Sequence, residues 1–177
     1  MNAGYRLSIL KLILCGYFDS TLLVTEYQMH CLECQKQLNI EDQQEARSKF
    51  ELDLCEGHRM RMEHVVEHYK IPVEAVILYY HLKNSGIQSM LAWWDGKNQV
   101  DLAISRVKLN ITIEDTSGDS QLTFPEFIHE ISHLAVKQNH GFNSLRIPAF
   151  QIRNYPEETV DQLRHIIQEI RQHIKLV

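Results

Sequence analysis

The sequence has little that would keep a segment from folding. Its 177 residues include only 7 glycines and 4 prolines, and these are scattered, so no Pro-, Gly- or Ser-rich linker is predicted. Hydrophobic residues make up 44% and charged residues 23%, as is ordinary for a soluble globular protein. The length suits one domain with a small appendage, which is the arrangement we expect.

An excess of positive charge is also lacking. The formal net charge is -5, which excludes a general positive field that would draw the protein onto nucleic acid. Any such contact must come from a local patch. The apolar run at residues 7–17 contains Lys11, is too short to cross a bilayer and has no small-residue cleavage pattern. We therefore expect neither a membrane segment nor a secretory signal, and a helix or strand packed on the domain instead.

Cysteine is scarce and unevenly spaced, with four residues in all. Without a secretory signal, this favours a reducing, cytoplasmic setting in which thiols act as ligands or core residues. Three of the cysteines join a histidine in two short-spaced pairs, Cys31 with Cys34 and Cys55 with His58. Two such pairs can supply the four corners of a Zn²⁺ tetrahedron and leave none open, so the predicted site is structural. Buried thiols beside a surface histidine are the alternative.

Alternation with a period of two predicts neighbouring strands. In residues 100–104, and again in 107–114, apolar side chains alternate with polar or small ones, so each strand should have one dry and one wet face. Residues 87–94 can form another strand before these, and residues 142–147 a fourth strand after them. The sequence therefore predicts three consecutive strands and a later one.

Helices are predicted between and around these strands. Residues 73–83 read as a mostly buried helix that Asn84-Ser85-Gly86 ends. A capping box starting at Thr123 predicts a helix that runs to about Gln138, and Pro156 begins a last helix with apolar residues at helical spacing. The order is helix, three strands, helix, strand, helix, which predicts an α/β fold with a mixed sheet flanked by helices.

Two patterns resemble those of zinc proteases. His129, Glu130 and His133 fit HExxH, and His64 with His68 fits the inverted HxxEH. On both helices the histidines point away from the apolar direction, and no third ligand follows at an expected spacing. We interpret both as solvated helix faces, with a small zinc hydrolase built on His129, Glu130 and His133 as the alternative.

Residues 115–126 resemble a calcium-binding loop, because oxygen-bearing side chains fall at the positions where ligands belong. Ser120 occupies the position of the sharp-turn glycine, and the segment before the loop alternates like a strand. A polar turn from a strand into a capped helix explains the same residues, so calcium binding stays an open alternative.

Several short fragments recur together from His30 onward. They are the metal-ligand pairs, Leu78-Tyr79-Tyr80-His81-Leu82-Lys83 before Gly86-Ile87, Asp95-Gly96, Val100-Asp101-Leu102-Ala103-Ile104, Lys108-Leu109-Asn110-Ile111 and Leu145-Arg146-Ile147-Pro148. With the predicted order of strands and helices, they resemble the restriction-endonuclease-like proteins that share the PD-(D/E)xK core. The resemblance implies a domain of this type at residues 71–177 and a zinc module at residues 1–70.

In that family an aspartate on one strand and an acidic residue on the next hold Mg²⁺, and a lysine two positions later helps to position the attacking water. The resemblance assigns Asp101 to the first position and either Thr112 or Glu114 to the second, because both lie on the wet face. The lysine position then falls on Glu114 or Thr116. Neither register places a lysine at this position, although Lys97 or Lys108 could substitute for it. Asp101 and Glu114 are thus candidate catalytic residues that could hold Mg²⁺ weakly, or else ordinary strand-end carboxylates.

The resulting hypothesis is a nuclease-like protein that binds nucleic acid, DNA in the first place, with weakened or lost phosphodiesterase activity. A protein partner is compatible with it, and no membrane is involved. Alternatives are the zinc hydrolase above and a zinc-containing module for protein interaction. Trp93 and Trp94 should point to opposite faces of a strand, so one could stack on a base. The candidate basic contacts are Arg59 and Arg61 beside the zinc pairs, and Lys97, Arg106 and Lys108 around the sheet.

Overall fold

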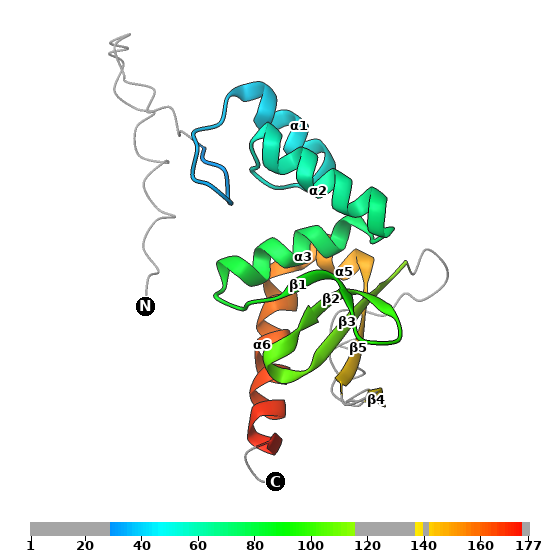
Figure 1. The fold of residues 1–177 in the computed structure, drawn as a ribbon. Helices are drawn as coiled ribbons and strands as arrows, with labels where there is room; N and C mark the ends of the chain where they lie inside the picture. Colours follow the sequence, from blue (N-terminus) through cyan, green and yellow to red (C-terminus); the bar gives the residue numbers. More distant parts are fainter. Residues whose placement is uncertain (1–28, 116–136, 140–141, 175–177) are drawn as a thin grey trace, which may run out of the picture.

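A computed structural model of the chain describes residues 29–115, 137–139 and 142–174 (Figure 1). Short helices form the N-terminal part, a mixed sheet follows, and a long helix ends the described chain. The elements are α1 (Ile40–Phe50), α2 (Glu56–Tyr69), α3 (Val73–Asn84), β1 (Met90–Trp94), β2 (Gln99–Ile104), a 3-10 turn (Ser105–Val107), β3 (Leu109–Glu114), β4 (Lys137–Asn139), β5 (Phe142–Pro148), α5 (Ala149–Asn154) and α6 (Pro156–Ile174).

The sheet has five strands in the order β1-β2-β3-β5-β4. The first three pair antiparallel, β5 lies parallel to β3, and β4 returns antiparallel along β5. Two parallel neighbours need a long connection between them, and the chain between β3 and β5 is long enough. It contains residues 115–136 and then β4. The predicted mixed α/β architecture, with a mixed sheet and helices, is confirmed.

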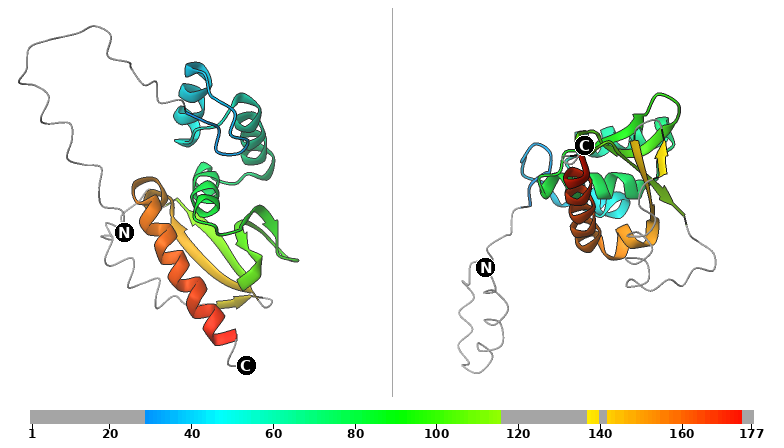
Figure 2. Two further views of the ribbon diagram at one scale, coloured as in Figure 1. Left: turned by 90° about the vertical axis from the view of Figure 1, so that its left-hand side faces the viewer. Right: turned by 90° about the horizontal axis from the view of Figure 1, so that it is seen from below.

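One face of the sheet carries the larger core. Alternate residues of β2, β3 and β5 project into it, among them Leu102, Ile111 and Ile147, which are at most 1% exposed. Helices α3, α5 and α6 cover this face, as Figure 2 shows. In α6 the buried residues recur at helical spacing, which explains why a helix with so many charged side chains packs stably here. This set comprises Val160, Leu163, Ile167 and Ile170.

A second, smaller core joins the N-terminal helices to α3. Phe50 of α1, Met62 of α2 and the buried Leu54 between these helices pack together with Val76 and Tyr80 of α3. On its other side α3 turns Ala75, Leu78 and Leu82 toward the sheet. Helix α3 is therefore buried on two sides, which explains why its apolar residues show no single stripe.

The structure corrects two expectations. The helix predicted to run to about Gln138 does not include residues 137–139, because these form strand β4, where Gln138 pairs with Asn143. The second face of the sheet is also not uniformly wet, since Ala103 and Asn110 are at most 2% exposed. The rest of the helix predicted from Thr123, the N-terminal run at residues 7–17 and the calcium-like loop after Asp115 lie outside the described residues.

None of the helices in the described ranges combines the length and the apolar character that a membrane crossing requires.

Candidate functional site

The first metal-ligand pair lies in a tight turn before α1. The N–H of Cys31 donates to the carbonyl oxygen of Lys36 at 2.8 Å, and the N–H of Gln35 donates back to the carbonyl oxygen of Cys31 at 2.9 Å. The turn closes through a left-handed residue, Gln35, whose φ is 60°. This backbone conformation is strained for a side chain other than glycine and persists only where the surroundings hold it. The hydrogen-bonded turn from Cys31 to Gln35 brings Cys34 back beside Cys31.

The second pair lies at the start of α2. Cys55 is the N-cap residue, with φ -72° and ψ 160°, and His58 follows in the first turn of the helix. The side chain of Cys55 makes no capping hydrogen bond and is free to point at the first pair. A helix N-terminus favours negative charge, so the location also suits a thiolate ligand.

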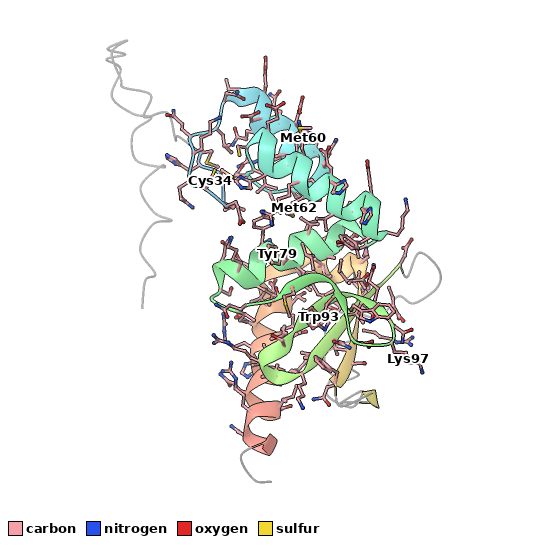
Figure 3. All side chains as sticks on the ribbon, viewed as in Figure 1. Cys34, Met60, Met62, Tyr79, Trp93 and Lys97 are labelled. Carbon is pink, nitrogen blue, oxygen red and sulfur yellow. The ribbon has the colours of Figure 1, made fainter. Side chains whose placement is uncertain are left out.

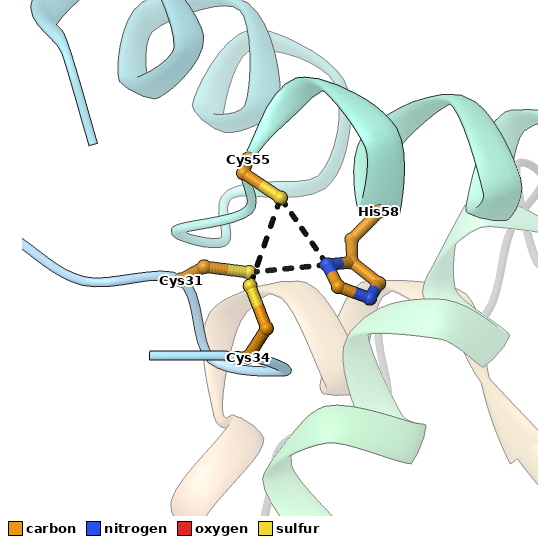
Figure 4. Close-up of side chains that lie close together, drawn as sticks. All are labelled: Cys31, Cys34, Cys55 and His58. Carbon is orange, nitrogen blue, oxygen red and sulfur yellow. Dashed lines mark hydrogen bonds between the residues drawn. The ribbon is translucent and has the colours of Figure 1, made fainter. Parts of the chain in front are cut away.

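The four ligand atoms converge on one point, as Figure 4 shows. All lie within 4.8 Å of one another. The Sγ atoms of Cys34 and Cys55 are 3.9 Å apart, and the Nδ1 atom of His58 lies 3.2 Å from Cys55 Sγ and 3.5 Å from Cys31 Sγ. A zinc tetrahedron has edges of about 3.8 Å between sulfurs and about 3.5 Å between sulfur and nitrogen. The Cys31, Cys34, Cys55 and His58 cluster could therefore hold a metal ion such as Zn²⁺.

The thiols of the cluster perturb one another. Burial alone would raise the pKa of Cys31, but N–H groups of Cys55, Cys34 and Glu33 stabilise the thiolate and lower it to about 6. Burial raises the pKa of Cys55, and the neighbouring Cys31 adds to this effect. The negative charges of the two thiolates repel each other. A metal cation between them would offset this repulsion and hold both cysteines in the deprotonated form that binds metal.

The metal-ligand turn is tied directly to α3. The Nζ atom of Lys83 lies 2.6 Å from a carboxylate oxygen of Glu33, which stands between Cys31 and Cys34. Burial alone would raise the pKa of Glu33, but Lys83 brings it below its usual range. The ammonium group of Lys83 also lies over the ring of the fully buried Tyr80, 5.9 Å from its centroid. The cluster is thus anchored on the helix that also covers the sheet.

Asp101 lies where the pairing between β2 and β3 changes. The two strands pair regularly from Ile104 to Leu102. At the next step the carboxylate of Asp101 accepts the N–H of Ile113 at 2.7 Å. On the other side of β2, Ala92 of β1 lies opposite Asp101. It stands between Leu91 and Trp93, which both pair with β2, and its φ of 50° is left-handed. Burial raises the pKa of Asp101, and the Ile113 N–H offsets only part of this rise. Strained backbone and a perturbed carboxyl group coincide here.

Glu114 has a partner that the sequence alone did not indicate. Its carboxylate accepts from the guanidinium of Arg146 at 2.7 Å, and both side chains are well exposed. Arg146 lies on β5 opposite Thr112 of β3, so their side chains share one face of the sheet. Only the parallel register of β3 and β5 could have revealed this pair. The predicted carboxylates are therefore held by different partners, Asp101 by Ile113 and Glu114 by Arg146.

The five predicted basic contacts do not form one patch. Arg59 is engaged by Glu45 and Glu63, and its side chain is only 11% exposed. Lys97 lies in the turn between β1 and β2, whereas Arg106 and Lys108 lie between β2 and β3. The six residues of β2 separate these turns by about 20 Å. Among the sheet candidates, only Lys97 shares the end of the sheet that holds Asp101 and Glu114. The fifth candidate, Arg61, is exposed on α2.

The histidine pair on α2 is exposed and its rings stack, with centroids 5.4 Å apart for His64 and His68. Over the described parts of the chain, no third histidine, cysteine or carboxylate joins them in a group that could hold a metal. The exposure of both rings is what the interpretation of a solvated helix face predicts. The HExxH residues His129, Glu130 and His133 lie outside the described residues.

Comparison with known families gives no assignment: no family model matches the chain. A search of the curated proteins also finds no match.

Metal binding by the cluster is directly measurable. We expect the purified chain to carry one metal ion, because the four ligands converge on a single point. Cys55→Ser should lose the ion and unfold at lower denaturant concentration, since metal binding is coupled to the folding of a small module. The measurements are elemental analysis and denaturant unfolding with and without a chelator. His68→Ala is the matched control and should keep the ion. Retention of a full equivalent by Cys55→Ser would contradict the assignment.

The raised pKa of Asp101 predicts how stability depends on pH. A carboxyl group whose folded-state pKa exceeds its unfolded value of about 3.9 contributes stability at low pH, which is lost as the pH rises through the window between the two values. Asp101→Asn keeps an acceptor for the Ile113 N–H and removes the charge. The free energy of unfolding of the variant, relative to the parent, should therefore rise with pH across this window. A difference that does not change with pH would show that the group titrates alike in both states.

Proposed function

We propose that the chain is a zinc-stabilised, nuclease-like protein that binds nucleic acid and has weakened or lost metal-dependent phosphodiesterase activity. Its expected nucleic-acid ligand is DNA. The Cys31, Cys34, Cys55 and His58 cluster serves as the structural zinc site, because three thiolates and an imidazole fill all four positions and leave none for a reacting water. The catalytic part of the proposal concerns the sheet.

The observation that carries the proposal is the arrangement around Asp101. A half-buried carboxyl group stands where two strands separate, with a strained residue, Ala92, across from it. Asp101 on the second strand matches the aspartate that helps to hold Mg²⁺ in the PD-(D/E)xK proteins that the sequence resembles, and a bound cation of this kind can stabilise the charge of a reacting phosphodiester. A cation at Asp101 would offset the unfavourable burial of its charge, which supports a role beyond packing.

The missing lysine supports loss of cleavage, not loss of binding. Arg146 places a fixed positive charge beside Glu114, on the face where the lysine of an active enzyme would act. A guanidinium stays protonated, so it can hold a phosphate oxygen but cannot exchange a proton with the attacking water. An exposed ion pair is weak, so a phosphate could replace Glu114 as the partner of Arg146.

The proposal predicts that Arg146 contributes to binding. Arg146→Gln should weaken the binding of a short DNA duplex and reduce the slope of log K against log salt by about 1, because one phosphate contact is lost. Fluorescence anisotropy at several salt concentrations measures both effects. Arg164→Gln is the matched control: Arg164 is an exposed arginine on α6 that pairs with Asp161. Equal binding by the parent and Arg146→Gln would remove Arg146 from the interface.

Plasmid nicking with Mg²⁺ or Mn²⁺ tests the catalytic part. We expect no more than slow nicking by the parent chain and none by Asp101→Ala. Nicking at equal rates by both would remove Asp101 from the mechanism. No binding to any nucleic acid would favour the alternative of a zinc-containing module for protein interaction.

A further inference from the structure

Exposed aromatic side chains occur both where α2 ends and where the β1–β2 hairpin begins. Tyr69 is the last residue of α2 and is 43% exposed, and Trp94 is the last residue of β1 and is 61% exposed. Gln99 joins the two positions. It pairs with Trp94 across the hairpin, and its Nε2 atom donates to the carbonyl oxygen of Tyr69 at 2.5 Å. Gln99 thus links the main chain at the end of α2 to the hairpin position opposite Trp94.

The aromatic group continues along α2. The ring of His68 meets the ring of Tyr69 edge to face, with centroids 4.7 Å apart. His64, one turn earlier, stacks on His68 with an interplanar angle of 19°. The side chains of His64, His68, Tyr69 and Trp94, here called the aromatic strip, are all exposed. The strip therefore adds little to the two cores and calls for another explanation.

Local packing does not require an exposed tryptophan at position 94. Its neighbour Trp93 is half-buried, and the indole N–H of Trp93 is inaccessible to solvent. Because successive side chains of a strand point to opposite faces of the sheet, Trp94 points to the face opposite that of Trp93. A small polar residue would serve the hairpin equally well, because the turn is held by Asp95, whose Oδ1 atom accepts the N–H groups of Lys97 and Asn98.

Positive charge flanks the strip. Lys70 follows Tyr69 directly, and Lys97 lies at the tip of the hairpin, where Figure 3 labels it. In the described part of the chain, ion pairs engage Lys49 and Lys83 but neither Lys70 nor Lys97. Glu67 is an exposed acid on the same stretch of α2. Flat rings between two available ammonium groups suit a ligand that offers both stacking faces and phosphates.

We infer that the aromatic strip binds unpaired bases of a single-stranded nucleic acid, with Trp94 and Tyr69 as stacking surfaces and Lys70 and Lys97 as phosphate contacts. A duplex keeps its base faces stacked inside and could use only the lysines. The inference rests on the proposed function and specifies its substrate: a single strand, or a single-stranded end, near the Asp101 end of the sheet.

The test compares a labelled oligothymidylate with the matched duplex, using the full chain with its metal bound. Anisotropy should show tighter binding of the single strand. Trp94→Ala and Tyr69→Ala should each weaken that binding about tenfold, since one stacked base contributes about 1–3 kcal/mol. Trp94→Phe should retain most of the affinity. Met60→Ala is the matched control, because Met60 is an exposed apolar residue on the same helix and is 56% exposed.

The outcomes separate this inference from the proposed function. Equal binding of the single strand and the duplex, unchanged in Trp94→Ala but weakened in Arg146→Gln, would overturn the aromatic strip and leave the proposed function standing. Failure to bind either ligand would overturn both. A dimer in sedimentation that dissociates in Trp94→Ala would also overturn the inference, because it would show that the strip is a contact between copies of the chain.

Discussion

The packing of α3 on two sides is the constraint on which the rest of the structure depends. One side of this helix closes the small core with Val76 and Tyr80, and the other lies on the sheet with Leu78 and Leu82. Burial of apolar area on both sides stabilises the helix by far more than its own propensity does. The metal-ligand turn and the sheet are therefore parts of one packed unit that meet at α3.

This arrangement relates the metal cluster to the sheet face. The cluster fixes the start of α2, α2 ends at Tyr69, and Gln99 of β2 binds that end. A metal ion at the cluster would thus help to place Tyr69 beside the hairpin, although the cluster itself lies at the other end of α2. The sheet adds a half-buried carboxyl group at Asp101 and a fixed cation at Arg146. In the proposed function, these two groups would hold nucleic acid without cleaving it efficiently.

Local patterns in the sequence predicted most of the elements. The spacing of Cys31, Cys34, Cys55 and His58 predicted a cluster that the structure brings together, and alternation predicted β2 and β3. Pairings over longer range could not be predicted. The contact of Arg146 with Glu114 depends on a parallel register between strands that are far apart in sequence. Likewise β4 is a strand only because it pairs with β5, which overrides a helical pattern.

The most direct test of this account is hydrogen exchange of the metal-loaded chain, with and without a chelator. Because the small core depends on the cluster and the large core does not, removal of the metal should speed exchange strongly in α1 and α2 and partly in α3. Exchange in β2 and β3 should stay slow. Unchanged exchange throughout the N-terminal helices, or equal acceleration in helices and sheet, would contradict the central claim that two cores meet at α3 and that the metal holds only the first.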